Sequence, residues 1–456
     1  MNKNRIEIIK TAELSIDKGE YVLYWMQQSM RVNYNHALNY AIERANESFL
    51  PVLVYFTIDT AFPYINKRSL FFMLEGLEEV KEELTNRGIN FIIEIGNVKD
   101  TINKYLKHTM LLITDKGYLR YQKSIREECF GLIDKNYPNI RIVMIDQDVI
   151  VPVNIVSQKV EYGAYTIRPK ITKMYLDYLD FHNLKEVDNK TKLNYQNIDI
   201  KFLYSVINVD ESVFKSEVYI GGYSKAKKIL YDFINNKLNY YLASSDPGLD
   251  LTSKLSMYLH FGQISSLEIL EHVLQAISNK QIDKNAGDSF IEQVLIRREL
   301  AYNYVTYNKY YDNFSFITES WAYKTMNEHA NDKKEYIYSI SEMIKLKTHD
   351  IYFNAAMKEM LETGYMHNYM RMYWAKKIIE WTPTFEEAYN IIVLLNNKYF
   401  IDGRDANSYA GIAWCFGKHD RPWKERNIFG KLRYMNDKGL ERKFDINKYI
   451  NRINSL

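Results

Sequence analysis

The chain has 456 residues, and its 60 lysines and arginines against 57 aspartates and glutamates leave a net charge of only +3, which argues against a nucleic-acid partner unless basic groups are locally concentrated. The 46% hydrophobic and 26% charged residues are typical of globular proteins and exclude disordered, collagen-like and coiled-coil classes. Cys129 and Cys415 are the only cysteines, which excludes a disulfide framework and a zinc finger and fits a reducing compartment.

The first 150 residues alternate between short apolar runs and amphipathic stretches. Strands are predicted at residues 21–25, 51–56, 91–95, 110–114 and 142–145. Residues 35–46 and 67–87 carry helical periodicity, and Gly88 is placed to end the second helix. Fully apolar strands that alternate with helices predict a doubly wound parallel sheet, that is, a Rossmann-like α/β domain over residues 1–150. No G-x-G-x-x-G motif follows the first strand, so the dinucleotide fingerprint is absent.

The periodicity changes after residue 150. Residues 151–215 contain Pro152, Pro169 and the polar stretch 185–199, and we interpret them as a linker that crosses the surface. Residues 216–456 are dominated by helical periodicity, with helices predicted at residues 225–242, 267–278, 289–307, 351–363, 366–381 and 385–396. The chain is therefore predicted to combine an α/β domain with a larger all-α domain.

Three hydroxyl groups and a lysine gather just before one helical stretch, at Thr252, Ser253, Lys254 and Ser256. Hydroxyls and free amides at the start of a helix can hold an anion, because the donors point outward and the helix dipole favours negative charge. Ordinary N-capping explains the same pattern, and spacing alone favours it.

Two further segments carry more polar or aromatic groups than packing needs. Trp374 and Trp381 lie seven residues apart on one helix face, with Arg371 one turn before Trp374, although such a stripe is more often core than part of a cofactor site. Residues 396–409 are predicted to form a polar loop of the kind that often carries function.

Residues 418–443 hold nine lysines and arginines against four acidic residues, and aromatic residues are interleaved with them. Such a segment suits a phosphate backbone with stacked or flipped bases, and a solvated charged face is the alternative. The histidines show no metal-binding spacing, and no P-loop or G-x-S-x-G motif is present, so we expect neither a metal site nor hydrolase or NTPase chemistry.

Several longer motifs occur in one order along almost the whole chain, at residues 21–29, 35–38, 255–265, 297–300, 369–377, 402–407 and 410–435. Together they resemble the DNA photolyase/cryptochrome superfamily, and within it the class II cyclobutane pyrimidine dimer photolyases. The last of these segments is the most specific to that class.

The resemblance implies a U-shaped FAD buried in the helical domain. The fully reduced FAD is expected to absorb light and to pass an electron to the pyrimidine dimer. The cyclobutane ring of the dimer then splits, and the electron returns to the flavin. A damaged site lowers the cost of moving the lesion out of the base stack. The residues expected to hold FAD are Tyr240, Thr252, Ser253, Lys254, Leu255, Ser256, Arg371, Asp402, Arg404 and Asp405. Asn396 is expected to face the redox-active nitrogen, where an amide can accept a hydrogen bond from the reduced ring.

For the lesion, the resemblance implies that Trp414 stacks on the dimer and that Met372 packs beside it. We expect Glu292 to hydrogen-bond the pyrimidine carbonyls as a protonated or proton-sharing acid in a dry pocket, with Glu299 as the second candidate or as a structural ion pair. Ile296 replaces an aromatic residue that the wider family often has nearby. Further DNA contacts are expected from Arg421, Trp423, Lys424, Arg426, Lys431 and Arg433.

The electron relay departs from the class II pattern. The class shares an Asp-x-x-Trp-Asn-Ala-Ala stretch, but this chain has Phe353 at the tryptophan position. Phenylalanine is far harder to oxidise, so the step from Trp374 to Phe353 is expected to fail and to strand the outer Tyr338, unless Tyr352 or Trp381 substitutes. We therefore expect repair with pre-reduced flavin to survive while photoreduction is slow.

The implied partner is UV-damaged DNA, and the implied family can hold a deazaflavin or folate antenna in its α/β domain, although no motif selects either. We expect a cytoplasmic monomer, nucleoid-associated during repair, because no apolar run approaches the roughly 18 residues that span a bilayer and residues 1–10 lack the apolar block of a signal peptide. Two alternatives are a cryptochrome-like blue-light receptor, disfavoured because no C-terminal extension is seen, and a repair-deficient flavoprotein that binds damaged DNA.

Overall fold

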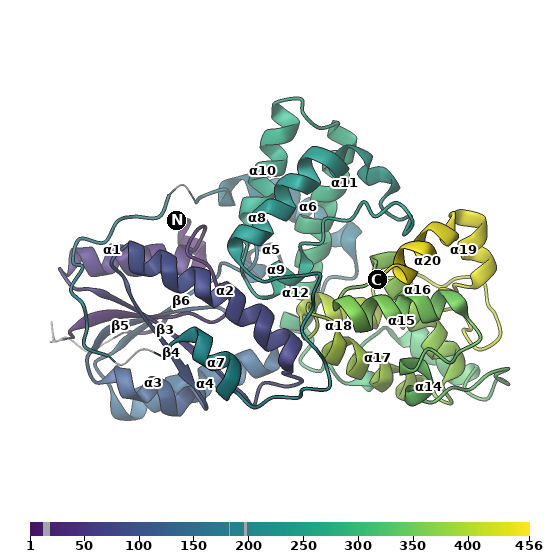
Figure 1. The fold of residues 1–456 in the computed structure, drawn as a ribbon, viewed down its shortest axis with the longest axis horizontal. Coiled ribbons are helices and arrows are strands. Elements are labelled where there is room, and N and C mark those ends of the chain that lie inside the picture. Colours follow the sequence, from purple (N-terminus) through teal and green to yellow (C-terminus); the bar gives the residue numbers. More distant parts are fainter. Residues whose placement is uncertain (12–18, 182, 196–197) are drawn as a thin grey trace.

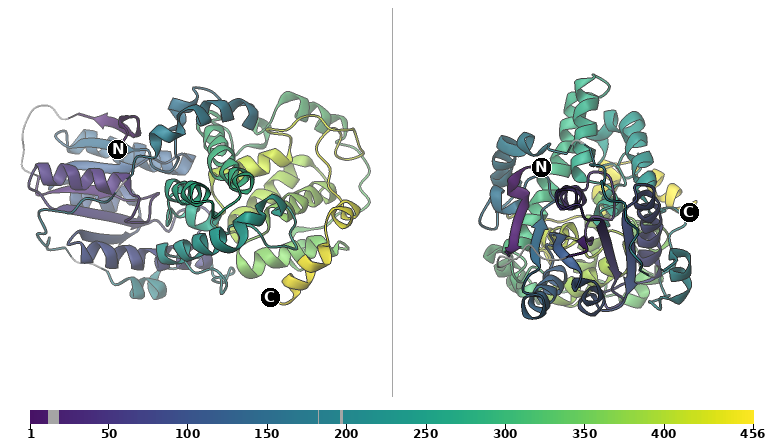
Figure 2. Two further views of the ribbon diagram at one scale, coloured as in Figure 1. Left: turned by 90° about the horizontal axis from the view of Figure 1, so that it is seen from above. Right: turned by 90° about the vertical axis from the view of Figure 1, so that its left-hand side faces the viewer.

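The computed structural model describes residues 1–456 with the exception of 12–18, 182 and 196–197. An α/β part built on one sheet lies beside a larger helical part along the longest axis of the molecule (Figure 1, Figure 2). This arrangement confirms the predicted fold class. None of the helices among the described residues is long and apolar enough to cross a membrane.

The sheet has six strands in the order β1-β6-β5-β2-β3-β4. They are β1 (Ile6–Lys10), β2 (Tyr21–Trp25), β3 (Val52–Ile58), β4 (Asn90–Ile95), β5 (Thr109–Asp115) and β6 (Arg141–Ile145). All neighbours are parallel except β1, which pairs antiparallel with β6 at the edge of the sheet. The five parallel strands were predicted, whereas β1 was not, because Glu7 and Lys10 interrupt its apolar residues.

Helices cover both faces of the sheet, as Figure 1 shows. They are α1 (His36–Glu47) and α2 (Lys67–Asn86) on one face, and α3 (Val98–Leu106) and α4 (Arg120–Asn136) on the other. Side chains alternate along β2, so that Val22 and Tyr24 join the core under α1 and α2, while Leu23 and Trp25 join the core under α3 and α4. The helix α2 ends at Asn86, and Arg87 and then Gly88 follow it; as predicted, Gly88 stands at the helix end, where its positive φ of 75° favours glycine.

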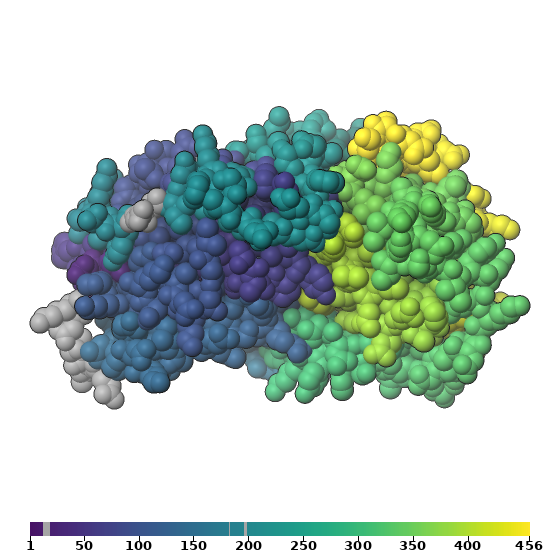
Figure 3. All heavy atoms as spheres, turned by 60° about the horizontal axis from the view of Figure 1, so that its bottom comes forward, coloured from purple at the N-terminus to yellow at the C-terminus, as the bar shows by residue number. Residues whose placement is uncertain are grey.

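The segment predicted as a linker contains three helices, α5 (Val153–Val156), α6 (Ala164–Met174) and α7 (Ile200–Val206). Between α6 and α7 the chain crosses the surface of the α/β part, where Asn46 and Asn90 donate side-chain hydrogen bonds to the carbonyls of Glu186 and Thr191, at 2.9 and 3.0 Å. The crossing is visible in Figure 3, where atoms near residue 200 (teal) lie over the blue and purple atoms of the α/β part.

The helical part begins with α8 (Tyr223–Asp232), which continues through one π turn and one 3-10 turn to Ala243. Its other helices are α9 (Ser256–His260), α10 (Ser266–Ser278), α11 (Lys284–Ile291), α12 (Arg298–Tyr307), α13 (Ser320–Glu328), α14 (Ile340–Ile344), α15 (Ile351–Thr363), α16 (Asn368–Trp381), α17 (Phe385–Tyr399), α18 (Ala406–Cys415), α19 (Asp437–Lys443) and α20 (Ile446–Asn454). The six predicted helices are all present.

The predicted loop at residues 396–409 is wrong in its extent. The helix α17 continues to Tyr399 and α18 begins at Ala406, so only residues 400–405 form the loop. Asn396 and Asn397 remain helical because their side chains hydrogen-bond each other and the loop instead of water.

One buried guanidinium group joins the two parts of the molecule. Arg68, in the first turn of α2, donates to the carbonyls of Phe214 (2.9 Å), Met360 (3.1 Å), Leu361 (2.5 Å) and Tyr399 (2.9 Å). Since these carbonyls include those at the ends of α15 and α17, a cation from the α/β part caps two helices of the helical part.

Candidate cofactor and DNA site

The hydroxyl-rich loop before α9 is fixed to the start of α16 through Tyr365. Thr252 Oγ1 lies 2.9 Å from the Tyr365 hydroxyl, and Lys254 Nζ lies 4.3 Å from the centre of the same ring. Lys254 also has a positive φ of 58°, which turns the chain into α9. No side chain caps α9, so the ordinary N-capping alternative does not explain these hydroxyls.

A cavity of about 310 Å³ opens beside Thr252, Ser253 and Lys254. Three cations surround Asp250 at its rim: Lys254 at 2.6 Å, Arg452 at 2.9 Å and Lys237 at 3.5 Å. Burial opposes ionisation of Asp250, but these cations outweigh it and lower the pKa of the carboxyl. The lining also contains Asp232 and Glu359, so its cations and carboxylates are equal in number, and phosphate groups would be held by individual donors such as Lys254 and Thr252.

Arg371, on α16, forms an ion pair with Asp402, which lies in the loop before α18. Arg371 Nη1 lies 3.1 Å from Asp402 Oδ1, and the guanidinium carbon lies 3.8 Å from the centre of the Phe400 ring. Arg371 Nε is buried and has no hydrogen-bond partner among the described residues. A buried unpaired donor is costly, so this nitrogen marks a place where a bound group can supply an acceptor.

The two asparagines near the end of α17 are locked together. Asn396 Nδ2 donates to Asn397 Oδ1 at 3.0 Å, and the same oxygen accepts from the backbone nitrogen of Arg404 at 2.9 Å. A Cβ atom at Gly403 would lie 2.6 Å from the Asn396 carbonyl oxygen, so only glycine lets the loop approach α17 this closely.

Arg404 acts as an anchor of this loop. Its guanidinium donates to the carbonyls of Asn397 (3.1 Å), Ile401 (3.4 Å) and, in the α/β part, Tyr64 (3.2 Å), and burial lowers its pKa to about 10. The side chain that was expected to line the flavin is therefore largely committed to backbone carbonyls.

Asp405 contacts the end of α9, the helix that follows the hydroxyl-rich loop. Its Oδ2 lies 3.1 Å from Nδ1 of His260, at the end of α9. Against the effect of burial, hydrogen bonds from His260 and Asn407 lower the pKa of Asp405 to about 2. His260 lies in the 255–265 motif, but no pattern in the sequence pairs it with Asp405.

Nine of the residues that were predicted to hold a cofactor are buried or half-buried, in several separate local contacts, and their role stays a prediction: Thr252, Ser253, Lys254, Leu255, Arg371, Asn396, Asp402, Arg404 and Asp405. Tyr240 and Ser256 are the exceptions. Tyr240 is 67% exposed, whereas the adjacent Tyr241 packs against Phe233 and Phe290, and Ser256 is exposed.

The residues predicted to contact the lesion lie on α16 and α18, next to the basic C-terminal segment. Met372 and Trp414 are both half-buried. The Arg433 guanidinium lies 5.7 Å from the Trp414 ring and 5.2 Å from the ring of Trp423, which is 41% exposed. The remaining basic side chains predicted to contact DNA are exposed: Arg421, Lys424, Arg426 and Lys431.

Glu292 lies in a different environment from the dry pocket that we expected. Arg168, on α6, makes a two-pronged ion pair with its carboxylate, at 2.7 and 3.0 Å, and Arg297 Nε lies 3.3 Å away. Two arginines therefore flank this half-buried carboxylate, which does not lie in an apolar pocket. Arg168 was missed because it lies in the predicted linker, and Ile296 packs in the core beside α6.

Glu299 is 2% exposed and accepts hydrogen bonds from the backbone nitrogens of Ile150 (2.5 Å) and Val151 (3.2 Å). Burial raises its pKa to about 8. The neighbouring Arg298 pairs with Asp148 at 3.0 Å instead. This geometry fits a structural role for Glu299, but its partners are backbone amides and not the ion-pair partner that was expected. The buried carboxyl has no exposed surface for a DNA contact.

A series of rings leads outward from Phe353. The ring centres of Phe353 and Trp381 are 5.0 Å apart, and those of Trp381 and Tyr338 are 5.2 Å apart. Trp374, one side of the predicted broken step, donates its indole N–H to the sulfur of Met357 at 2.9 Å. Tyr352 donates to Glu441 at 2.7 Å, away from this series.

Comparison with known proteins places this geometry in a family. The family model for DNA photolyase matches residues 22–188. A deoxyribodipyrimidine photo-lyase of Methanothermobacter thermautotrophicus is 42% identical over 447 residues, which cover 96% of each chain. The chain belongs to the DNA photolyase family. A photolyase of this name from Arabidopsis thaliana is 37% identical over 95% of this chain and 89% of its own.

Solved structures support the photolyase fold at low sequence identity. A bacterial class III photolyase from Agrobacterium tumefaciens superposes with a TM-score of 0.74 at 15% identity, covering 96% of this chain and 87% of its own. An archaeal photolyase from Sulfolobus tokodaii, described with two FAD molecules, gives a TM-score of 0.66 at 16% identity over 94% and 89% of the two chains.

Proposed function

We propose that this protein is a class II-like deoxyribodipyrimidine photo-lyase that repairs cyclobutane pyrimidine dimers in DNA with light and FAD. The observation that carries the proposal is that Arg371, Asn396 and Asp405, three polar residues of the predicted cofactor set, are each fixed in the helical part by a polar contact. The 42% identity to a deoxyribodipyrimidine photo-lyase over 96% of both chains supports it. We assign FAD and DNA binding to residues 216–456 and a possible antenna to residues 1–150.

The residues of the site fit a flavin nucleotide. The hydroxyls of Thr252 and Ser253 and the cations at the 310 Å³ cavity suit a diphosphate, and the unpartnered Nε of Arg371 suits a ring acceptor. When bound in its fully reduced form, FAD supplies the electron that light transfers to the dimer. Since Asn396 Nδ2 is held by Asn397, its amide oxygen is the atom left to accept a hydrogen bond from the ring.

The contacts of Glu292 change what this carboxylate can do for the lesion. The carboxyl oxygens of Glu292 can accept a hydrogen bond from the imide N–H of a pyrimidine, and Arg168 and Arg297 beside it can donate to the pyrimidine carbonyls. Trp414 offers a ring for stacking on the flipped dimer, and the exposed basic residues 421–433 offer phosphate contacts.

A second cavity is the candidate position for an antenna chromophore. It has about 140 Å³, lies between the α/β part and α9, and is lined by Met30, Phe56, Tyr121 and Phe261 among others. Cavities for ligands of this size usually have about 300–1,000 Å³, so a deazaflavin or folate requires side-chain movement there.

The test is an absorbance spectrum of the purified protein, followed by blue-light repair of a dimer-containing oligonucleotide after chemical reduction. We expect flavin bands and light-dependent loss of the dimer, with none in the dark. A colourless protein contradicts the proposal. Dimer-specific binding in the dark without light-dependent repair identifies a repair-deficient flavoprotein instead.

A further inference from the structure

Tyr338 and His349 form a hydrogen-bonded pair at the outer end of the ring series. The Tyr338 hydroxyl lies 2.8 Å from His349 Nδ1, and the backbone nitrogen of His349 donates to the same hydroxyl oxygen at 3.2 Å. The backbone N–H occupies one acceptor position on this oxygen and leaves the phenolic O–H free to donate. In the imidazole tautomer that carries its hydrogen on Nε2, the phenol donates to Nδ1.

Aromatic rings hold the imidazole in place from two sides. The Tyr336 ring stacks on His349 with centres 3.9 Å apart and an angle of 26°, and the Trp381 ring centre lies 5.3 Å away. Trp381 also accepts a backbone hydrogen bond from Tyr338 at 3.3 Å. The phenol, the imidazole and the indole are therefore fixed relative to one another before any electron moves.

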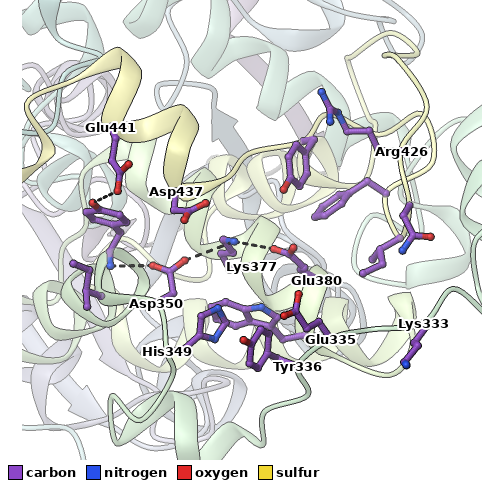
Figure 4. A pocket seen from close by; sticks show the side chains of 17 residues that line it. Lys333, Glu335, Tyr336, His349, Asp350, Lys377, Glu380, Arg426, Asp437 and Glu441 are labelled. Carbon is purple, nitrogen blue, oxygen red and sulfur yellow. Dashed lines mark hydrogen bonds and ion pairs between the residues drawn. The ribbon is translucent and has the colours of Figure 1, made fainter.

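The pair borders a solvent-accessible pocket that can take up a proton. This pocket has about 660 Å³ and is lined by five carboxylates against three cations. Figure 4 shows His349 and Tyr336 at one edge, with Lys377 between Asp350 and Glu380. The carboxylates of this lining are acceptors for a proton that leaves the imidazole.

We propose that His349 is the proton acceptor for Tyr338 when Trp381 oxidises it. Trp381, after losing one electron to light-excited oxidised flavin, takes one electron from Tyr338, and the phenolic proton moves to Nδ1 of His349. The products are neutral Trp381, a neutral Tyr338 phenoxyl radical and an imidazolium ion at His349, which releases its proton through the pocket. The oxidation of Trp381 by light-excited flavin rests on the proposed function, whereas the proton transfer from Tyr338 to His349 rests on the geometry of this pair.

The first experiment uses the holoenzyme with Phe353→Trp, in which the relay is restored, and follows tyrosyl radical formation after a laser flash on oxidised flavin. His349→Asn keeps a hydrogen-bond acceptor but removes the base. We expect it to slow Tyr338 oxidation on the order of tenfold and to abolish its solvent deuterium isotope effect, because a positioned base is lost. In a Tyr338→Phe background, His349→Asn should change nothing. His108→Asn, at an exposed histidine paired with Glu20, is the matched control.

The second experiment removes the dependence on flavin. A photogenerated ruthenium(III) polypyridyl oxidant replaces light-excited flavin, and the same variants are compared. A slower rate and a lost isotope effect for His349→Asn support the proposal, even if the flavin experiment shows no photochemistry and the proposed function fails. Unchanged rates and isotope effects in this experiment overturn the proposal and make water the acceptor.

Discussion

Replacement of Arg68 by methionine should destabilise the whole molecule, because this one side chain ties the α/β part to two helices of the helical part. Methionine keeps the apolar stem but removes all the donors to the carbonyls of Phe214, Met360, Leu361 and Tyr399. These carbonyls then lose a charged partner in a buried position.

The size of the effect follows from two opposing contributions. Hydrogen bonds from a charged donor contribute about 1.5–3 kcal/mol each, so the four bonds of Arg68 exceed about 6 kcal/mol. Burial outweighs nearby negative charge and lowers the pKa of Arg68 from 12.5 to about 10, which corresponds to a net cost of about 3 kcal/mol for the charged guanidinium that methionine does not carry. The expected net loss is about 3–5 kcal/mol, the usual cost of removing one partner of a buried charged interaction.

Thermal unfolding measured by circular dichroism tests this value. A loss of 4 kcal/mol lowers the Tm by about 4 °C if all 456 residues unfold together, and by about 8 °C if the helical part unfolds alone. The control is Arg87→Met at the other end of α2, where the arginine makes partly exposed pairs with Glu83 and Glu186 and should matter by less than about 1 kcal/mol. Equal melting temperatures for the two variants would refute the reasoning.

Three further predictions concern the relay, the lesion and pH. Phe353→Trp should accelerate flavin photoreduction at least about tenfold, which corresponds to lowering the barrier for electron transfer by about 1.4 kcal/mol. An unchanged rate in flash photolysis contradicts the interpretation that Phe353 breaks the relay. Trp414→Ala should remove about 1–3 kcal/mol of stacking and weaken binding of dimer-containing DNA about 5- to 150-fold in fluorescence anisotropy; an equal loss on undamaged DNA argues against lesion stacking. The Glu299 pKa of about 8 in the folded state exceeds its unfolded value of 4.5, so the folded state binds the proton more tightly. The free energy of unfolding therefore falls as the pH rises from 4.5 to 8, by at most about 1.4 kcal/mol per pH unit. Glu299→Gln should flatten this slope in urea titrations, and a slope that persists assigns it to other groups.

The sheet and the helices could be predicted because their patterns are local. Runs such as residues 21–25 are apolar throughout and lie buried on both faces, whereas β1 alternates charged and apolar residues at a half-exposed edge. The loop at residues 400–405 was predicted too long because paired amides such as Asn396 and Asn397 look like loop residues when their partners are unknown.

The site was predictable only as far as its motifs extend. Asp405 and Arg371 belong to recognised segments, but the partners of buried cations are mostly backbone carbonyls, which carry no signal in the sequence. The pairing of Arg168 with Glu292 spans 124 residues, and neither residue type indicates the other at that distance. Tyr338 and His349 are closer in sequence, but Tyr338 precedes α14 and His349 precedes α15, so their contact depends on how the chain folds back between these two positions.

The antiparallel edge strand has a consequence for the order of events during synthesis. β1 ends at Lys10, but β6, the strand that it pairs with among the described residues, begins at Arg141. At about 5–20 residues per second, the ribosome needs roughly 7–26 s to make the intervening chain. During that time the first strand emerges without the strand that it pairs with, and its charged Glu7 and Lys10 discourage association with other nascent chains. The edge of the sheet is therefore closed by a strand that is synthesised well before its partner.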